Sequence, residues 1–254
     1  MPTISVLSWN AYGGNITDLA TAITSCNIDI AVIQEATRQA IAPFYAPLNA
    51  LAPGYGVLPA IAENQTWHTP TGGNITPDPS QIRAYAVVYN TATIGAPGAP
   101  PGGAPVAALV DYTTQYACPN SAFQAGLDGF SQRPPLRVRF SHAGNTCVLY
   151  TWHAPLLHRN GQGIRMFDGC PRLAQDVASG NLVIIGGDMN NKNISAARFA
   201  AFDGLQDGYD HVFAANITSI QDTRLVPGTT LLQIGHLNAL HAAPHWAVPA
   251  TLTY

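Results

Sequence analysis

Six places in the sequence put metal-binding or proton-transferring side chains directly at the end of an apolar run. They are Trp9-Asn10, Gln34-Glu35, Trp152-His153, Gly187-Asp188-Met189-Asn190, Tyr209-Asp210-His211 and His245-Trp246. A side chain can be held in a fixed orientation where a rigid strand meets solvent, and catalysis requires such orientation. A single asparagine or histidine at a strand end is more often a turn or structural residue. The six places together favour a catalytic site.

These residue types allow metal binding and proton transfer. Glu35 is a hard oxygen donor suited to Mg²⁺, or alternatively Mn²⁺, and Mg²⁺ takes one or two carboxylates together with several waters. Asp188 and Asn190 lie two residues apart in a segment that we expect to be extended. Their side chains would then face the same way, so that one can activate water while the other donates a hydrogen bond. His153 and His245 are imidazoles that change protonation near neutral pH and can act as donors or general bases.

Apolar runs and turn residues predict the elements that position these side chains. We expect strands at residues 3–9, 29–34, 84–89, 136–140, 146–152, 182–186, 209–214 and 245–253, and helices at residues 16–25 and 164–178. Within the fourth strand Leu136, Val138 and Phe140 alternate with Arg137 and Arg139, so the two sets face opposite sides. The Gly-, Ala- and Pro-rich residues 95–105 form either a flexible loop or an ordered irregular crossing. The order of elements is that of a layered α/β protein, and we find no repeat or domain boundary.

The cysteines are arranged unlike those of a zinc site. Cys26, Cys118, Cys147 and Cys170 contain no C-x-x-C pair, which argues against structural zinc. Cys147 lies in an apolar run, and we expect it to be a buried thiol. Cys118 and Cys170 sit beside prolines in loop-like sequence, and they could pair if the chain is exported.

Taken in order, the six motifs resemble those of the endonuclease/exonuclease/phosphatase superfamily. Its members carry Trp-Asn on the first strand, Gln-Glu on the second, a strand-end His, Gly-Asp-x-Asn and a final Asp-His. The match spans almost the whole chain, so we expect residues 1–254 to form one domain. Residues 133–140 and the His153-Ala154-Pro155 stretch are similar to pancreatic-type deoxyribonucleases and the cytolethal distending toxin B subunit. The resemblance implies a four-layer α/β/β/α sandwich of two mixed β-sheets with outer helices.

The resemblance also implies hydrolysis of a phosphodiester and gives roles to individual residues. Hydrolysis requires a water attacking in line, neutralised charge on the non-bridging oxygens and a stabilised leaving alkoxide. Asn10 would hold the metal-water shell with Glu35 or contact a phosphate oxygen. Asp210 would orient the ring of His245, and Asn190 would donate to the phosphate as well as belong to the catalytic group.

Two arginines and one acid extend this implied site. Arg133 would contribute a guanidinium to the phosphate oxygens. Arg139 either does the same or lies on a solvated strand face. Some relatives support the first His with a second carboxylate, for which Glu63, the only glutamate besides Glu35, is the candidate.

One departure from the family concerns the metal. Where the family ends in Ser-Asp-His, this chain has Ala243-Pro244-His245, so a proline replaces an aspartate that often completes the metal shell. Three accounts are open: Mg²⁺ is held by Glu35, Asn10, waters and phosphate alone; another acid such as Asp207 or Asp210 substitutes; or catalysis is weakened or lost.

Three functions therefore compete. The first is a DNA endonuclease that acts as a secreted toxin or effector, with separate delivery subunits as partners. The second is a phosphatase or phosphodiesterase of the same fold acting on phosphoinositide or sphingomyelin-like lipids, for which the mostly apolar residues 92–110 would contact the membrane. The third is a nucleic-acid-binding relative without turnover.

Composition narrows these functions. With 47% hydrophobic and 10% charged residues the chain can bury a core, and its net charge of −3 argues against coating nucleic acid with a basic face. No run of about 18 apolar residues predicts a transmembrane helix. Residues 1–4 lack the features of a signal peptide, so secretion would require one that is not present in this chain. Ten of the eleven basic residues are arginine, which fits either genome composition or a host-targeted toxin that avoids ubiquitin.

Overall fold

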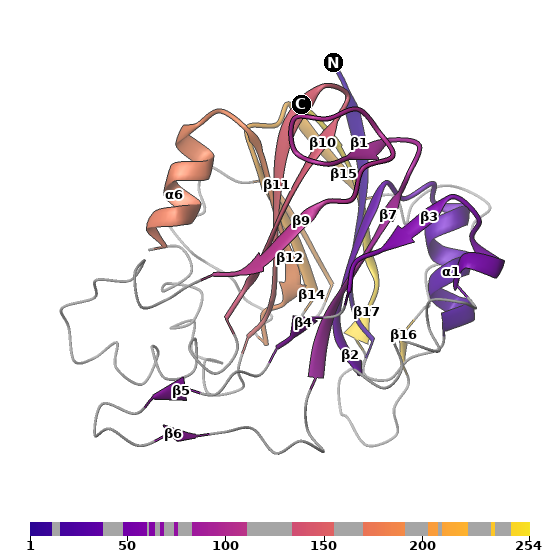
Figure 1. The fold of residues 1–254 in the computed structure, drawn as a ribbon, viewed down its shortest axis with the longest axis vertical. Coiled ribbons are helices and arrows are strands. Elements are labelled where there is room, and N and C mark those ends of the chain that lie inside the picture. Colours follow the sequence, from indigo (N-terminus) through magenta and orange to yellow (C-terminus); the bar gives the residue numbers. More distant parts are fainter. Residues whose placement is uncertain are drawn as a thin grey trace.

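Two mixed β-sheets face each other at the centre of the computed structural model (Figure 1). The structure describes residues 1–11, 16–37, 48–59, 61–63, 67–68, 74–75, 83–110, 134–154, 170–190, 203–207, 210–222, 235–236 and 245–254. One sheet, here called the β1 sheet, has the strand order β15-β18-β1-β2-β7-β3, with β4 also paired to β7. The other, the β12 sheet, has the order β13-β14-β12-β11-β10-β8, with β9 also paired to β10.

The long strands follow the predicted apolar runs closely, and the sheets also contain short strands that the sequence did not predict. The β1 sheet consists of β1 (Thr3–Asn10), β2 (Ile30–Thr37), β3 (Tyr55–Val57), β4 (Ile61–Ala62), β7 (Arg83–Asn90), β15 (Ser219–Asp222) and β18 (Val248–Thr253). The β12 sheet consists of β8 (Ile94–Gly95), β9 (Val106–Leu109), β10 (Leu136–His142), β11 (Asn145–His153), β12 (Leu182–Asp188), β13 (Asp203–Asp207) and β14 (Asp210–Ala215). Two short pairs lie outside these sheets: β5 (Trp67–His68) with β6 (Asn74–Ile75), and β16 (Gly235–His236) with β17 (His245–Trp246).

One helix covers the outer face of each sheet, so the described part of the chain has the predicted four layers (Figure 1). Helix α1 (Ile16–Ser25) buries Leu19 and Ile23 against the outward side chains of the β1 sheet. Helix α6 (Pro171–Ala178) buries Leu173 against Tyr150 and Ile185 of the β12 sheet. Both helices have their apolar residues at helical spacing, which is why each presents one face to a sheet.

The main core lies between the sheets. Inward residues recur at every second position, as they must in a strand: Ile4 and Val6 of β1, and Leu149 of β11, all belong to one fully buried cluster. Leu136, Val138 and Phe140 of β10 join the same cluster, which confirms the predicted alternation.

Two predictions need correction, and one pair of alternatives is decided. The second helix begins at Pro171 rather than crossing it, because proline suits the first helical turn, where its missing N–H costs no hydrogen bond; residues 155–169 lie outside the described residues. Residues 245–253 form two strands, β17 and β18, separated at Ala247. Residues 95–105 are an ordered irregular crossing, since Gly95 forms a bridge with Pro101 at the edge of the β12 sheet.

The structure also tests the predictions for the cysteines and for membrane-spanning helices. Cys147 is fully buried, as predicted, and Cys170 is a free, fully buried thiol rather than half of a disulfide; Cys118 lies outside the described residues. Among the described residues, no helix has the length and apolar character needed to cross a membrane.

Candidate active site

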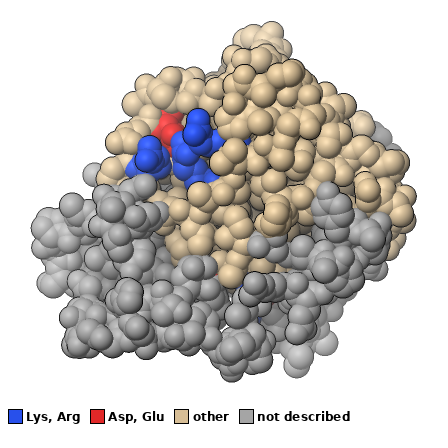
Figure 2. Space-filling view, viewed as in Figure 1, with Lys and Arg blue, Asp and Glu red and all other residues tan. Residues whose placement is uncertain are grey.

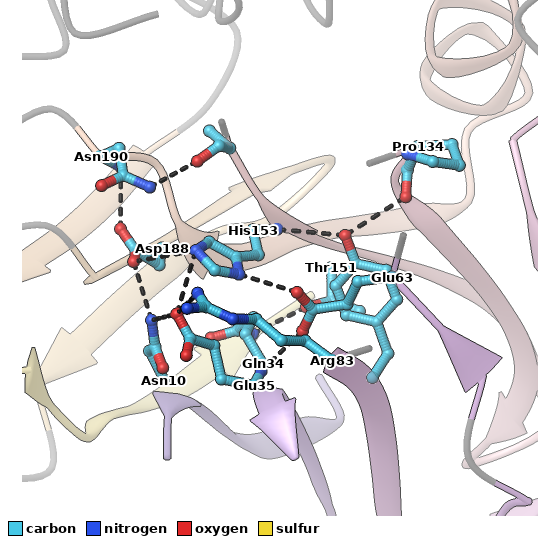
Figure 3. A network of polar contacts seen from close by, with 12 residues as sticks. Asn10, Gln34, Glu35, Glu63, Arg83, Pro134, Thr151, His153, Asp188 and Asn190 are labelled. Atoms are coloured by element: carbon cyan, nitrogen blue, oxygen red, sulfur yellow. Dashed lines mark hydrogen bonds and ion pairs between the residues drawn. The ribbon is translucent and has the colours of Figure 1, made fainter. Parts of the chain in front are cut away.

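The layer between the sheets changes from apolar to polar at one end of its strands. Ser8 and Asn10 follow Val6 on the inward face of β1, and Thr151 and His153 follow Leu149 on that of β11. Within each sheet, strand pairing brings polar ends level, because Asn10 pairs with Gln34 of β2 and His153 pairs with Asp188 of β12. Figure 3 shows the resulting network of side chains, which come from both sheets and point toward one another. The sequence therefore brings most of its predicted site residues together through the period-two pattern of its strands.

The close approach of the sheets at this level depends on glycine. A Cβ on Gly186 would lie 3.2 Å from the side chains of Ser8 and Val32 in the opposite sheet. A Cβ on Gly187 would lie 2.0 Å from the carbonyl oxygen of Trp152 in the neighbouring strand. The Gly-Gly pair before Asp188 therefore lets β12 approach both neighbours and delivers the carboxylate into the layer.

Glu35 enters the site through a β-bulge. The pairing of β2 with β7 shifts register between Ile33 and Ala36, and Glu35 has a φ of 56°, in the left-handed region. Strict alternation would send Gln34 and Glu35 to opposite faces, but both reach the layer between the sheets: Gln34 donates to Thr151 Oγ1 at 2.7 Å. A glutamate in this backbone region is strained, and strain of this kind clusters at functional sites.

His153 is held between carboxylates. Its Nδ1 lies 2.7 Å from Glu63 Oε2, and its Nε2 lies 3.3 Å from Glu35 Oε1 and 3.8 Å from Asp188 Oδ2 (Figure 3). Glu63 is fully buried, and its second oxygen accepts the backbone N–H of Glu35 at 2.6 Å. Glu63 thus fixes both the histidine ring and the strained backbone of Glu35. The sequence singled out Glu63 only through the family resemblance, because the short strand β4 that precedes it carries no clear periodicity.

Asn10 ties the acids of both sheets together. Its amide nitrogen donates to Asp188 Oδ2 at 2.8 Å and to Glu35 Oε1 at 3.4 Å. Its backbone N–H donates to Asp210 Oδ1 at 3.2 Å, and Asp210 is fully buried beside Asp188, with which it pairs across β12 and β14. Asn10 therefore orients the carboxylates as well as lying beside the predicted metal ligand.

The geometry predicted for Asp188 and Asn190 is wrong. Asn190 has a φ of 50°, so the segment turns instead of remaining extended. The backbone N–H of Asn190 donates to Asp188 Oδ1 at 2.8 Å, and its amide nitrogen donates to the carbonyl oxygen of Ala154. Asparagine tolerates the left-handed region because its short side chain bonds locally, so the turn keeps both side chains at the site by another route.

Sequence reasoning missed Arg83 and Tyr85, which lie on the inward face of β7. The Arg83 guanidinium forms an ion pair with Glu35 Oε1. The Tyr85 hydroxyl accepts the backbone N–H of His153 at 3.2 Å and donates to the carbonyl oxygen of Pro134 at 3.2 Å. The sequence could have indicated both, because Arg83 and Tyr85 continue the alternation of Val87 and Tyr89 at the polar end.

The two arginines predicted to bind phosphate have different outcomes. Arg133 lies outside the described residues, although its neighbour Pro134 contacts the site through Tyr85. Arg139 is exposed on the outer face of the β12 sheet, which confirms the solvated-face interpretation and removes it from the site. In the view of Figure 2, one small cluster of basic side chains has an acidic neighbour. Arg137 pairs with Asp176 at 2.6 Å.

The predicted roles of the His245 side chain fall on residues outside the described part of the structure. The backbone of His245 pairs with His236, but its side chain and those of Asp207 and Pro244 lie outside the described part of the structure. The contact between Asp210 and the ring of His245 therefore stays a prediction.

The donor set suits a hard divalent cation. Within the described part of the chain, no group of three or more His, Cys, Asp or Glu is arranged to hold a metal ion. Mg²⁺ needs fewer protein ligands, because it keeps several waters. Four buried carboxylates, of Glu35, Glu63, Asp188 and Asp210, meet at the site. Oxygen donors of this kind are those that Mg²⁺ prefers, so the residues present would fit a cation at Glu35 and Asn10.

The fold is similar to that of several solved structures. No protein-family model and no curated protein sequence matches this chain. An endonuclease/exonuclease/phosphatase family protein from Bacteroides thetaiotaomicron has a TM-score of 0.58 at 11% identity, covering 99% of this chain and 95% of that one. The mannosyl-6-phosphatase of B. thetaiotaomicron VPI-5482 has a TM-score of 0.58 at 11% identity, covering 99% and 100%. TDP2 from D. rerio, complexed with a single strand DNA product, has a TM-score of 0.54 at 14% identity, covering 100% of both. The predicted resemblance is confirmed at the level of structure: the chain has the endonuclease/exonuclease/phosphatase fold.

Proposed function

We propose that this protein is a metal-dependent phosphoester hydrolase and, more specifically, a DNA endonuclease. The observation that carries the proposal is the buried His153, held by Glu63 on one side and facing Glu35 and Asp188 on the other. A module that only binds nucleic acid has no need of a histidine fixed between carboxylates. The arrangement therefore favours turnover over the binding-only alternative.

The chain's own residues can bind and orient a phosphate and move a proton. Glu63 holds His153 by Nδ1, so Nε2 is the atom that donates to a phosphate oxygen or takes up a proton. Asp188, oriented by Asn10 and by the backbone of Asn190, is the acceptor for the proton of an attacking water. Asn190 has a second amide hydrogen besides the one bound to Ala154, and it would donate that hydrogen to the phosphate.

A Mg²⁺ or Mn²⁺ ion held by Glu35 and Asn10 would supply charge neutralisation at the phosphate oxygens and at the leaving alkoxide. Pro244 replaces the aspartate expected from the family, and the position of Asp210 beside Asp188 and Asn10 supports the account in which another acid substitutes. Catalysis without that aspartate is part of the proposal.

The choice of DNA rests on motifs and on one structural neighbour. The His153-Ala154-Pro155 stretch is similar to deoxyribonucleases, and the D. rerio TDP2 structure contains a single strand DNA product. The lipid alternative is less well supported, because the 92–110 segment is anchored to the edge of the β12 sheet by the short strands β8 and β9, and Val106 is its exposed large hydrophobic residue. Because one structural neighbour is a mannosyl-6-phosphatase, a sugar phosphate is the alternative substrate to test beside DNA.

Nicking of supercoiled plasmid tests the proposal. Purified protein is incubated with Mg²⁺ or Mn²⁺, with a chelator control and with His153→Ala made in parallel. We expect nicking that disappears with the chelator and in the variant. Absence of nicking together with release of phosphate from sugar phosphates or phosphoinositides would instead assign a phosphatase. DNA binding without product under any metal condition would assign the binding-only alternative.

We also propose that the protein acts as a secreted toxin or effector, with delivery subunits as partners. Its support is the resemblance to toxin subunits and the use of arginine for ten of the eleven basic residues. Adding surface lysines should shorten the half-life of the protein in a host cytosol if lysine avoidance protects it. An unchanged half-life would leave genome composition as the explanation.

A further inference from the structure

Arg83 forms an ion pair with Glu35, the carboxylate predicted to hold the metal. Its guanidinium pairs with Glu35 Oε1, the same oxygen that accepts from Asn10 and faces His153 Nε2. The Arg83 side chain is 33% exposed, whereas that of Glu35 is 7% exposed. The arginine therefore approaches the carboxylate from the open side of the site.

The backbone on both sides holds this pair in place. The carbonyl oxygen of Arg83 accepts the backbone N–H of Glu63 at 2.8 Å, and Arg83 pairs with Thr37 where β2 resumes after the bulge. Glu63 in turn holds the backbone N–H of Glu35 at 2.6 Å. Both partners are thus anchored to the bulged part of the sheet, so the charge pair is built into the fold.

A divalent cation on Glu35 would meet the guanidinium at short range. Two unit charges about 4 Å apart at an effective dielectric constant near 20 repel strongly enough to change a dissociation constant by about a thousandfold. Solvent screening at the partly exposed guanidinium reduces this effect. Arginine does not lose its charge near neutral pH, so the repulsion is relieved only when the guanidinium moves. The exposed side of Arg83 gives it room to do so.

We propose that Arg83 is a built-in competitor of the metal, neutralising Glu35 in the metal-free protein and leaving it when a divalent cation binds. The inference rests on the metal-dependent part of the proposed function and adds the residue that sets metal affinity. It does not depend on DNA as the substrate.

Direct Mn²⁺ binding tests it. Free Mn²⁺ is counted by electron paramagnetic resonance during titration of wild type, Arg83→Gln, Arg83→Lys and the control Arg139→Gln, which removes an equal charge from the outer face of the β12 sheet. We expect Arg83→Gln to bind at least tenfold more tightly than wild type, while Arg83→Lys and Arg139→Gln stay within threefold. Glu35→Gln should abolish the tight site. Equal or weaker binding by Arg83→Gln, or no binding by either protein, overturns the proposal.

A second test uses the wild-type protein, so its result does not depend on whether the variants fold. The side-chain Nε resonance of Arg83, assigned with Arg83→Lys, should shift in ¹⁵N spectra as Mg²⁺ is added, with the same midpoint as binding. An Arg83 resonance that stays fixed while Mg²⁺ saturates the protein refutes displacement. Failure of plasmid nicking alone would count against the DNA substrate and leave the binding result intact, so the two proposals can fail separately.

Discussion

Replacing Glu63 by glutamine changes the hydrogen bond that holds His153, whereas the side chain at position 63 keeps nearly the same volume. Glu63 accepts two hydrogen bonds, from the backbone N–H of Glu35 at 2.6 Å and from His153 Nδ1 at 2.7 Å. A glutamine side chain has one oxygen and one NH₂ group, so it can accept only one of the two. If the oxygen stays with Glu35, the NH₂ group faces Nδ1 and forces the proton of His153 onto Nε2. The ring then presents the wrong tautomer to the phosphate.

The two effects of this change have different sizes. Exchanging the carboxylate for an amide replaces charge-assisted hydrogen bonds by neutral ones, which costs about 1 kcal/mol of folding stability. A correctly oriented general acid or base is worth about 10²–10⁴ in rate, and an equivalent tautomer change in a serine protease costs about 10⁴. We therefore expect Glu63→Gln to lower kcat at least about 100-fold, which is about 2.7 kcal/mol in activation free energy. KM should change little, because Glu63 is fully buried and does not reach the substrate.

Asp29→Asn is the matched control. Asp29 is also a buried acid, accepting the backbone N–H of Ser5 and the hydroxyl of Thr93, each at 2.7 Å, but it lies before the start of β2, at the other end of that strand from Glu35. It should lose similar stability and keep full activity. The rates are measured on plasmid and on bis(p-nitrophenyl) phosphate, with thermal unfolding in parallel. A Glu63→Gln protein within threefold of wild-type kcat, or an Asp29→Asn protein equally impaired, would refute the positioning role.

Other perturbations test the packing and the buried titratable groups. Gly187→Ala should cost at least about 2 kcal/mol, and Gly186→Ala about 1 kcal/mol, in urea unfolding, because the added methyl meets backbone at 2.0 Å in the first and side chains at 3.2 Å in the second. Burial lowers the pKa of His142, so the folded protein resists its protonation. Stability should therefore fall as pH drops below about 6.5, and His142→Gln should lessen that fall in melts at pH 5 and 7.5. Burial also raises the pKa of Cys147 to about 11, so mass spectrometry should find this thiol unalkylated in the native protein at pH 8 and modified after unfolding.

Much of the fold could be predicted because its strands obey a simple period. The alternation in residues 136–140 gives the inward and outward faces correctly, and the apolar runs ending in Asn10, His153 and Asp188 are the strands that deliver those side chains. Residues that follow the period at the end of an apolar run also meet in space, because neighbouring strands end level. The alternation along each strand therefore predicted which side chains meet where paired strands end.

The period fails at Glu35 and Asn190, where the backbone takes positive φ values. No local propensity predicts a glutamate in the left-handed region, because its cost is met by distant contacts such as that of Glu63 with the Glu35 N–H. Glu63 was likewise hard to predict, because its role depends on contacts across the chain that single-strand patterns do not encode. Arg83, in contrast, continues the alternation of β7. The family resemblance identified Glu35 as a site residue, although it did not predict the left-handed backbone at that position.

The charges at the site follow from this geometry and limit its chemistry. The chain contains only two glutamates, and both are buried here beside Asp188 and Asp210. Buried carboxylates are tolerated when cations or hydrogen-bond donors offset them, and Arg83, Asn10 and His153 provide that offset. Any ligand that enters must replace or reinforce these partners, which disfavours a free anion and favours a phosphate accompanied by a cation. Arg83 and the metal are alternative partners of Glu35 in this arrangement. Because a bound phosphate attracts the metal, the metal and the phosphate substrate should each raise the affinity for the other.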